Sequence, residues 1–153
     1  MSMPDDPLVM NDYTLLLVDE DVPSLTVLQN ELSVEGYRIL TAHSAQEALD
    51  LLARQYPSVV VADYRLPGMD GNEFFRRIRE LYPWVVRIMV SHACSEDLLA
   101  DAINTGGIYK FLKKPVSSSQ LGEVLRKIFA ASYLSEGSLG WIAAQQAAHQ
   151  GPL

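Results

Sequence analysis

The sequence of 153 residues holds a single cysteine, Cys94, which excludes an internal disulfide and a cysteine-based zinc site. The three histidines, His43, His92 and His149, show no metal-ligand spacing. No apolar run approaches the roughly 18 residues of a membrane-spanning helix. We therefore expect a cytoplasmic protein without a membrane-bound part.

Positive charge is also scarce, since 12 Lys and Arg stand against 19 Asp and Glu, for a net charge of −7. A general basic surface for nucleic acid or anionic lipid is not expected from this balance. The glycine-rich phosphate loops G-x-G-x-x-G and G-K-[ST] do not occur either. The acids are concentrated early, and Asp19, Glu20 and Asp21 directly follow an apolar run.

Five short runs rich in β-branched residues predict strands, and segments of helical period separate them. The strands are expected at Thr14–Val18, 37–41, 59–62, 85–90 and 108–112. Helix signals between and after them include a capping box at Ser44 and an apolar stripe of Phe74, Ile78 and Leu81. Strand and helix thus alternate five times. This order predicts an α/β fold, a doubly wound (βα)5 sandwich of three layers around a parallel five-stranded sheet.

Polar residues directly follow four of the predicted strands, and the C-terminal ends of parallel strands meet at one edge of such a sheet. Clustered carboxylates suit the hard cation Mg²⁺, while a lysine and a hydroxyl can bind a tetrahedral anion. The expected site therefore handles phosphoryl groups, and its nucleophile is a carboxylate. The residues that meet there are Asp19, Glu20, Asp21, Asp63, Ser91, Lys114 and Pro115.

Four segments resemble the response-regulator receiver domains of two-component signalling, which are CheY-like and flavodoxin-like in fold. They are LLLVDED at 15–21, VVVADYRLPGMDG at 59–71, IMVS at 88–91 and FLKKP at 111–115. The resemblance covers about residues 12–131. It implies that residues 1–11 are a flexible acidic leader. Residues 132–153 would be a linker, or the start of a helix toward an output domain.

The resemblance also implies the roles of the acidic residues. Asp63 would accept the phosphoryl group. Mg²⁺, or Mn²⁺ in its place, would be held by Asp19, Glu20, Asp63 and the backbone carbonyl of Arg65. Catalysis would consist mainly of positioning and charge neutralisation, with no separate cofactor.

The remaining implied roles concern the switch. Lys114 would pair with the phosphoryl oxygens, and Ser91 would bond to them after transfer. Phe111 would turn inward as Ser91 moves, which reshapes the face formed by the fourth helix, the fifth strand and the fifth helix. The Lys114–Pro115 bond would be cis, a form that only an X–Pro bond adopts at low cost.

Two residues depart from what is common in the family. His92 follows Ser91 where a small residue is usual, and Arg65 is long and cationic at a variable position. Both are expected at the mouth of the site. We hypothesise that Arg65 and His92 set how long the acyl phosphate lasts.

The implied function is a signalling switch and not an enzyme. Its partners would be a sensor histidine kinase or phosphotransfer protein and an output domain or effector. A homodimer could form through a helix around Trp141 and Ile142. The run at 102–112 looks like receivers that precede cyclic-dinucleotide enzymes, or like some kinase-linked regulators, rather than like the commonest DNA-binding ones.

Three alternatives stay open. The first is a degenerate receiver that acts as a docking module without phosphorylation, and the second is a stand-alone receiver in a phosphorelay. The third is a Mg²⁺-dependent phosphatase with an aspartyl nucleophile. The phosphatase is disfavoured, because it would need a second acid where Arg65 stands.

Overall fold

The computed structural model describes residues 13–92 and 95–134, with side chains to residue 131. A five-stranded parallel sheet forms the centre, in the order β2-β1-β3-β6-β7. Its strands are β1 Thr14–Val18, β2 Arg38–Ala42, β3 Val59–Asp63, β6 Val86–Ser91 and β7 Lys110–Lys113. A small antiparallel pair, β4 Arg65–Leu66 and β5 Met69–Asp70, follows β3. The predicted doubly wound α/β fold is confirmed.

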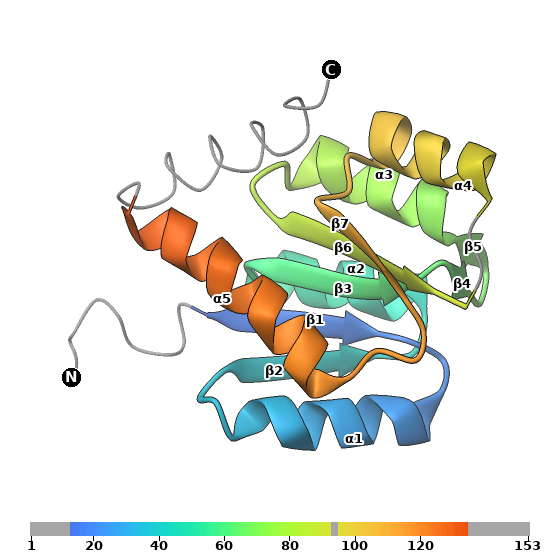
Figure 1. Ribbon diagram of the computed structural model, residues 1–153. Coiled ribbons are helices and arrows are strands. Elements are labelled where there is room, and N and C mark those ends of the chain that lie inside the picture. The colour runs from blue at the N-terminus through green and yellow to red at the C-terminus, as the bar shows by residue number, and fades with distance from the viewer. Residues whose placement is uncertain (1–12, 93–94, 135–153) are drawn as a thin grey trace.

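Helices cover both faces of the sheet, with α5 in front of it and α2 behind it in Figure 1. One face packs against α1 and α5, and the other packs against α2, α3 and the η2 segment. Because both faces are covered, β1 and β3 are buried along their whole length. The helices are α1 Val22–Ser33, α2 Ala45–Gln55, α3 Gly71–Leu81, α4 Glu96–Asp101, η2 Ala102–Gly106 (a π-helix) and α5 Ser118–Leu134.

Several strand bounds differ from those expected. The fifth strand begins at Lys110 and not at residue 108, because the amide of Ile108 still donates to the carbonyl of Ala102 in the preceding turn. Likewise β2 begins at Arg38, whose amide donates to the carbonyl of Tyr13. The fourth strand runs one residue further than expected and includes Ser91.

The predicted apolar stripe of the third helix is partly wrong. Phe74 and Ile78 are buried as expected, but Leu81 is 60% exposed and Phe75 is buried instead. Phe75 faces η2, where the backbone of Gly106 approaches it closely, whereas Leu81 occupies the last turn. The fourth helix is also not regular, since α4 continues directly into the π-helix η2.

Some predictions concern parts of the chain outside the described residues. These are the acidic leader at 1–11, the thiol of Cys94, the dimer helix around Trp141 and Ile142, and most of the stretch 132–153. Among the described residues, no helix has both the length and the apolar character to cross a bilayer.

Candidate functional site

Four of the predicted site residues meet at the C-terminal edge of the sheet. Asp19 directly follows β1, Asp63 and Ser91 end β3 and β6, and Lys114 directly follows β7. The parallel register brings these ends together, because Asp63 pairs with Val90 one residue before Ser91. Asp19, Asp63 and Ser91 are only 6%, 8% and 3% exposed. The sheet therefore holds two carboxylates and a hydroxyl in a largely dehydrated rim.

The ammonium group of Lys114 lies between the two carboxylates. Its Nζ is 2.5 Å from Asp19 Oδ2 and 2.6 Å from Asp63 Oδ2. The other oxygen of each carboxylate accepts a backbone amide two residues further on. Asp19 Oδ1 accepts from Asp21 N at 2.9 Å, and Asp63 Oδ1 accepts from Arg65 N at 3.1 Å. Each carboxylate is thus fixed by a backbone donor on one side and by the ammonium on the other.

Two opposing effects set the pKa of Lys114. Burial alone would lower this pKa, because it disfavours the charged form. The hydrogen bonds and negative charges of Asp19 and Asp63 together outweigh burial, and the pKa of Lys114 is raised above its ordinary value. The lysine therefore remains a cation at neutral pH, where it balances one of the two carboxylate charges.

Backbone contacts hold Lys114 and the proposed switch residues in place. The amide of Lys114 donates to the carbonyl of Ser91 at 2.9 Å, and the Lys114–Pro115 bond is cis. Phe111 is half-buried on β7 opposite Met89 of β6. Because side chains alternate along a strand, Ser91, two residues after Met89, lies on the same sheet face as Phe111. The two switch candidates therefore share one face of the sheet.

Two carboxylates form the centre of the donor set that a divalent cation would find at this edge of the sheet. Asp19 and Asp63 already converge on one cationic nitrogen, and oxygen ligands of this kind suit Mg²⁺. Glu20 is exposed, and no group of three His, Cys, Asp or Glu side chains within the described ranges is arranged to hold a metal. The pair fits a hard cation in its chemistry, and further ligands would have to come from Glu20, from backbone carbonyls or from water.

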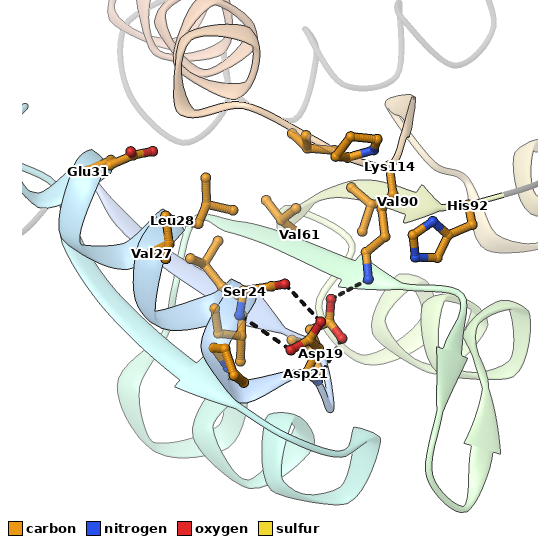
Figure 2. Close-up of a pocket in the computed structure, with 16 residues that line it drawn as sticks. Asp19, Asp21, Ser24, Val27, Leu28, Glu31, Val61, Val90, His92 and Lys114 are labelled. Atoms are coloured by element: carbon orange, nitrogen blue, oxygen red, sulfur yellow. Dashed lines mark hydrogen bonds and ion pairs between the residues drawn. The ribbon is translucent and has the colours of Figure 1, made fainter.

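A groove of about 410 Å³ opens beside the carboxylate pair, between α1 and the segment after β7. Asp19, Asp21, His92 and Lys114 line its polar end. Figure 2 shows Lys114 reaching toward Asp19, with the ring of His92 beside it. His92 is exposed, as expected for the mouth of the site. Arg65 is also exposed, but it does not line the groove.

Asp21, the third residue of the acidic triplet, has a different role from its neighbours. Its side chain caps α1 by accepting from the amide and the hydroxyl of Ser24, at 3.4 and 2.8 Å. These two hydrogen bonds lower the pKa of Asp21, with smaller contributions from the charges of Lys114 and His92. The spacing of Asp21 and Ser24 is a common capping signal that the sequence reading passed over.

Sequence reasoning also missed two polar clusters on the α3 side of the sheet. Asn72 donates to Asp101 at 2.6 Å, across 29 residues of sequence. Arg87 is buried near the start of β6, where it donates to the carbonyls of Val85 and Gly106. No local sequence pattern predicts either cluster, because the fold brings together partners that are distant in the sequence.

The parallel α/β sheet, with a lysine-bridged aspartate pair and a serine at its C-terminal edge, defines a class of domain built to accept phosphoryl groups. Residues 15–126 match the family described as "Response regulator receiver domain". The chain belongs to this family.

Longer regulatory proteins are among its relatives. The hydrogenase transcriptional regulatory protein HoxA of Cupriavidus necator is 40% identical over 122 residues, which cover 79% of this chain and 25% of HoxA. The transcriptional regulatory protein GlrR of Escherichia coli K12 is 37% identical over 112 residues, which cover 72% of this chain and 25% of GlrR. The chain thus spans about a quarter of the length of these curated relatives.

Solved receiver domains match over nearly their whole length. The signal receiver domain of an HD domain-containing protein from Pseudomonas fluorescens Pf-5 is 36% identical with a TM-score of 0.75, covering 79% of this chain and 97% of that one. A CheY-like receiver domain protein from Methanospirillum hungatei is 26% identical with a TM-score of 0.76, covering 80% and 98%.

Proposed function

We propose that this receiver domain accepts a phosphoryl group on Asp63 and uses it to change an interaction surface. The observation that supports this most directly is the position of Lys114 Nζ, within 2.6 Å of both Asp19 and Asp63 at the buried strand ends. A nucleophilic carboxylate beside a fixed cation is what phosphoryl transfer by positioning and charge neutralisation requires.

In the proposed transfer, a carboxylate oxygen of Asp63 attacks the phosphorus of a phosphohistidine. The new P–O bond forms as the P–N bond breaks, and the imidazole leaves with its electron pair and takes up a proton. The arriving phosphoryl oxygens are anionic, so Lys114 can exchange its bond to Asp63 for a bond to one of them. The amide of Arg65 keeps the Asp63 carboxyl group oriented during this exchange.

Mg²⁺, or Mn²⁺ in its place, would be held by Asp19 and Asp63, with Glu20 and the carbonyl of Arg65 as further ligands. When bound, the ion supplies positive charge that offsets the charge of the phosphoryl oxygens. The residues of the chain itself prepare for this, because the acidic pair is ordered before any phosphate arrives: a backbone amide fixes one oxygen of each carboxylate.

The readout would run through Ser91 and Phe111 to the α4–β7–α5 surface. Ser91 is buried at the rim and Phe111 is half-buried on the same sheet face. Movement of the Ser91 hydroxyl toward the phosphoryl group would open space beside the Phe111 ring. The ring could then turn inward and change the surface that a partner contacts.

The proposed partners are a sensor histidine kinase or a phosphotransfer protein on the input side, and an output domain or effector on the other. The groove beside Lys114 supports the input partner, since it leads from the polar site along apolar residues of α1 such as Val27 and Leu28. The names of the relatives point to different outputs, since they include transcriptional regulators and an HD domain-containing protein. We propose a cytoplasmic location and a role as phosphoacceptor rather than enzyme.

Mass spectrometry after incubation with Mg²⁺ and a small acyl phosphate tests the proposal. The wild type should gain the mass of one phosphoryl group, Asp63→Asn should not, and Asp50→Asn should gain it like the wild type, because Asp50 is an exposed acid on α2. A gain that survives Asp63→Asn would mean that another residue accepts the group. No gain in the wild type would favour a docking module that works without phosphorylation.

A further inference from the structure

Helix α4 is weakly held by apolar packing. None of its residues, Glu96–Asp101, is buried, and Leu98 and Leu99 are only half-buried. The chain becomes buried again in η2, at Ala102 and Gly106. Figure 1 shows α3 and α4 next to each other on the same face of the sheet. Leu99 packs against the core at its edge, so a polar contact from α3 to α4 adds to what fixes this helix.

The far end of the α4–η2 segment is firmly anchored. Arg79 Nη1 donates to the carbonyl of Asn104 at 2.8 Å, and the buried Arg87 Nε donates to the carbonyl of Gly106 at 2.9 Å. A Cβ at Gly106 would lie 2.9 Å from the Cβ of Phe75, so the backbone there rests directly on α3. This end can serve as a pivot, while the α4 end has more freedom to move.

The α4 end is held by a hydrogen bond from the start of α3. Asn72 Nδ2 donates to Asp101 Oδ2 at 2.6 Å, and Thr105 Oγ1 donates to the other oxygen of Asp101 at 2.9 Å. Asn72 is only 9% exposed, and its Oδ1 is buried without a hydrogen-bond partner. An apolar residue would avoid this unsatisfied acceptor, so the contact with Asp101 is the evident reason for an asparagine here.

Asn72 is also tied to the loop that directly follows Asp63. Gly71 N donates to the carbonyl of Tyr64 at 2.7 Å, and a Cβ at Gly71 would lie 2.7 Å from Tyr64 Cα. The two backbones are therefore in direct contact, one residue away from Asn72 and one residue away from Asp63. A displacement of this loop would therefore press on Gly71 and, through it, on the Asn72 side chain that holds Asp101.

We propose that the Asn72–Asp101 hydrogen bond locks α4 in the unphosphorylated arrangement and breaks when the loop responds to phosphorylation of Asp63. Asn72 and Asp101 are positioning residues, and they give the site a second route to the α4 surface besides Ser91 and Phe111. This inference rests on the proposed function. By thermodynamic linkage, weakening the lock must strengthen binding of a phosphoryl mimic at Asp63.

The test is a titration with beryllofluoride in excess Mg²⁺, followed by the backbone amide NMR signals of α4. Asn72→Asp sets two carboxylates against each other while retaining a side chain suited to the first turn of a helix. The swap N72D/D101N restores the hydrogen bond, because the new amide at position 101 can donate to the new carboxylate. Thr105→Val is the matched control, since it removes the other hydrogen bond of Asp101 but leaves the link to α3 intact.

Asn72→Asp should lower the beryllofluoride midpoint by about five-fold or more, the lower end of typical coupling between sites. The swap should return the midpoint toward the wild-type value, and Thr105→Val should not change it. A merely structural role would reduce the urea midpoint of Asn72→Asp and leave the beryllofluoride midpoint unchanged, which would overturn the lock. If the wild type itself shows no saturable titration, the phosphoacceptor proposal fails, and the lock fails with it.

Discussion

Replacing Lys114 with methionine removes the ammonium group from between Asp19 and Asp63 and keeps a side chain of similar length. In the wild type this one nitrogen contacts an oxygen of each carboxylate. Without it, two mostly buried negative charges face each other. We expect Lys114→Met to be clearly less stable than the wild type when no divalent metal is present.

The size of the loss follows from the geometry. Both oxygens lie within 2.6 Å of Nζ, so the carboxylates are close neighbours. Two unit charges about 5 Å apart repel by roughly 3 kcal/mol at an effective dielectric constant of about 20. Breaking a buried ion pair by removing one partner typically costs about 3 to 5 kcal/mol, and the repulsion between the two carboxylates falls at the lower end of that range. We therefore expect the free energy of unfolding to fall by about 3 kcal/mol.

Urea unfolding in EDTA and again in Mg²⁺ measures this. In EDTA the Lys114→Met midpoint should fall by roughly 2 M, given a typical slope for a small domain. Mg²⁺ should stabilise the variant more than the wild type, because the metal would supply the missing counter-charge. The exposed neighbour Lys113 provides the control Lys113→Met, which should unfold like the wild type. Equal midpoints for all three proteins in EDTA would refute the claim that the ammonium balances the carboxylate pair.

Three further predictions follow from other contacts. Hydrogen bonds from two arginines of α3 lower the pKa of Glu73 from 4.5 to about 2, so the stabilising effect of the Glu73 carboxylate is present above pH 4.5 and is lost as the pH falls toward 2. The difference in Tm between the wild type and Glu73→Gln should therefore vanish over that pH range. A difference that stays constant with pH would contradict this prediction. Gly71→Ala should destabilise by about 2 kcal/mol through its backbone clash, whereas Gly122→Ala in α5 should be neutral or stabilising by about 0.5 kcal/mol. Dephosphorylation rates of Arg65→Ala and His92→Ala should differ from the wild-type rate, and unchanged lifetimes for both would remove them as tuning residues.

The positions of the site residues could be predicted from the sequence, because only the strand ends and the parallel direction of the strands are needed to place them. Apolar runs mark where strands end, and parallel topology brings those ends to one edge. Asp19, Asp63, Ser91 and Lys114 each lie at such an end, so errors of one or two residues in the strand bounds did not disturb their convergence. The bound of β7 was wrong by two residues at its start, yet Lys114 still follows its end.

The contacts between α3 and the α4–η2 segment could not be predicted in the same way. Asn72 reads as an ordinary helix residue, and Arg87 contradicts the apolar pattern of its strand. The carbonyl of Gly106 that compensates the buried guanidinium lies 19 residues further along the chain. Burial lowers the pKa of Arg87 to about 10, with a smaller effect from the charge of Arg79, and this cost is invisible without the fold. A hydrophobic pattern reports how much is buried, but not which distant carbonyl is available to a buried donor.

The same hydrogen bonds that stabilise the resting site also determine what phosphorylation must change. Both oxygens of Asp63 already have donors, the ammonium of Lys114 and the amide of Arg65. A phosphoryl group on Asp63 would arrive where these donors already bind, so the contact between Asp63 and Lys114 has to change. The ammonium of Lys114 can shift its bond to the new oxygens, whereas the amide of Arg65 belongs to the loop that continues to Gly71 and Asn72. Any adjustment on that side is passed to the backbone, which is why we expect the acceptor loop, as well as Ser91, to report phosphorylation to α4.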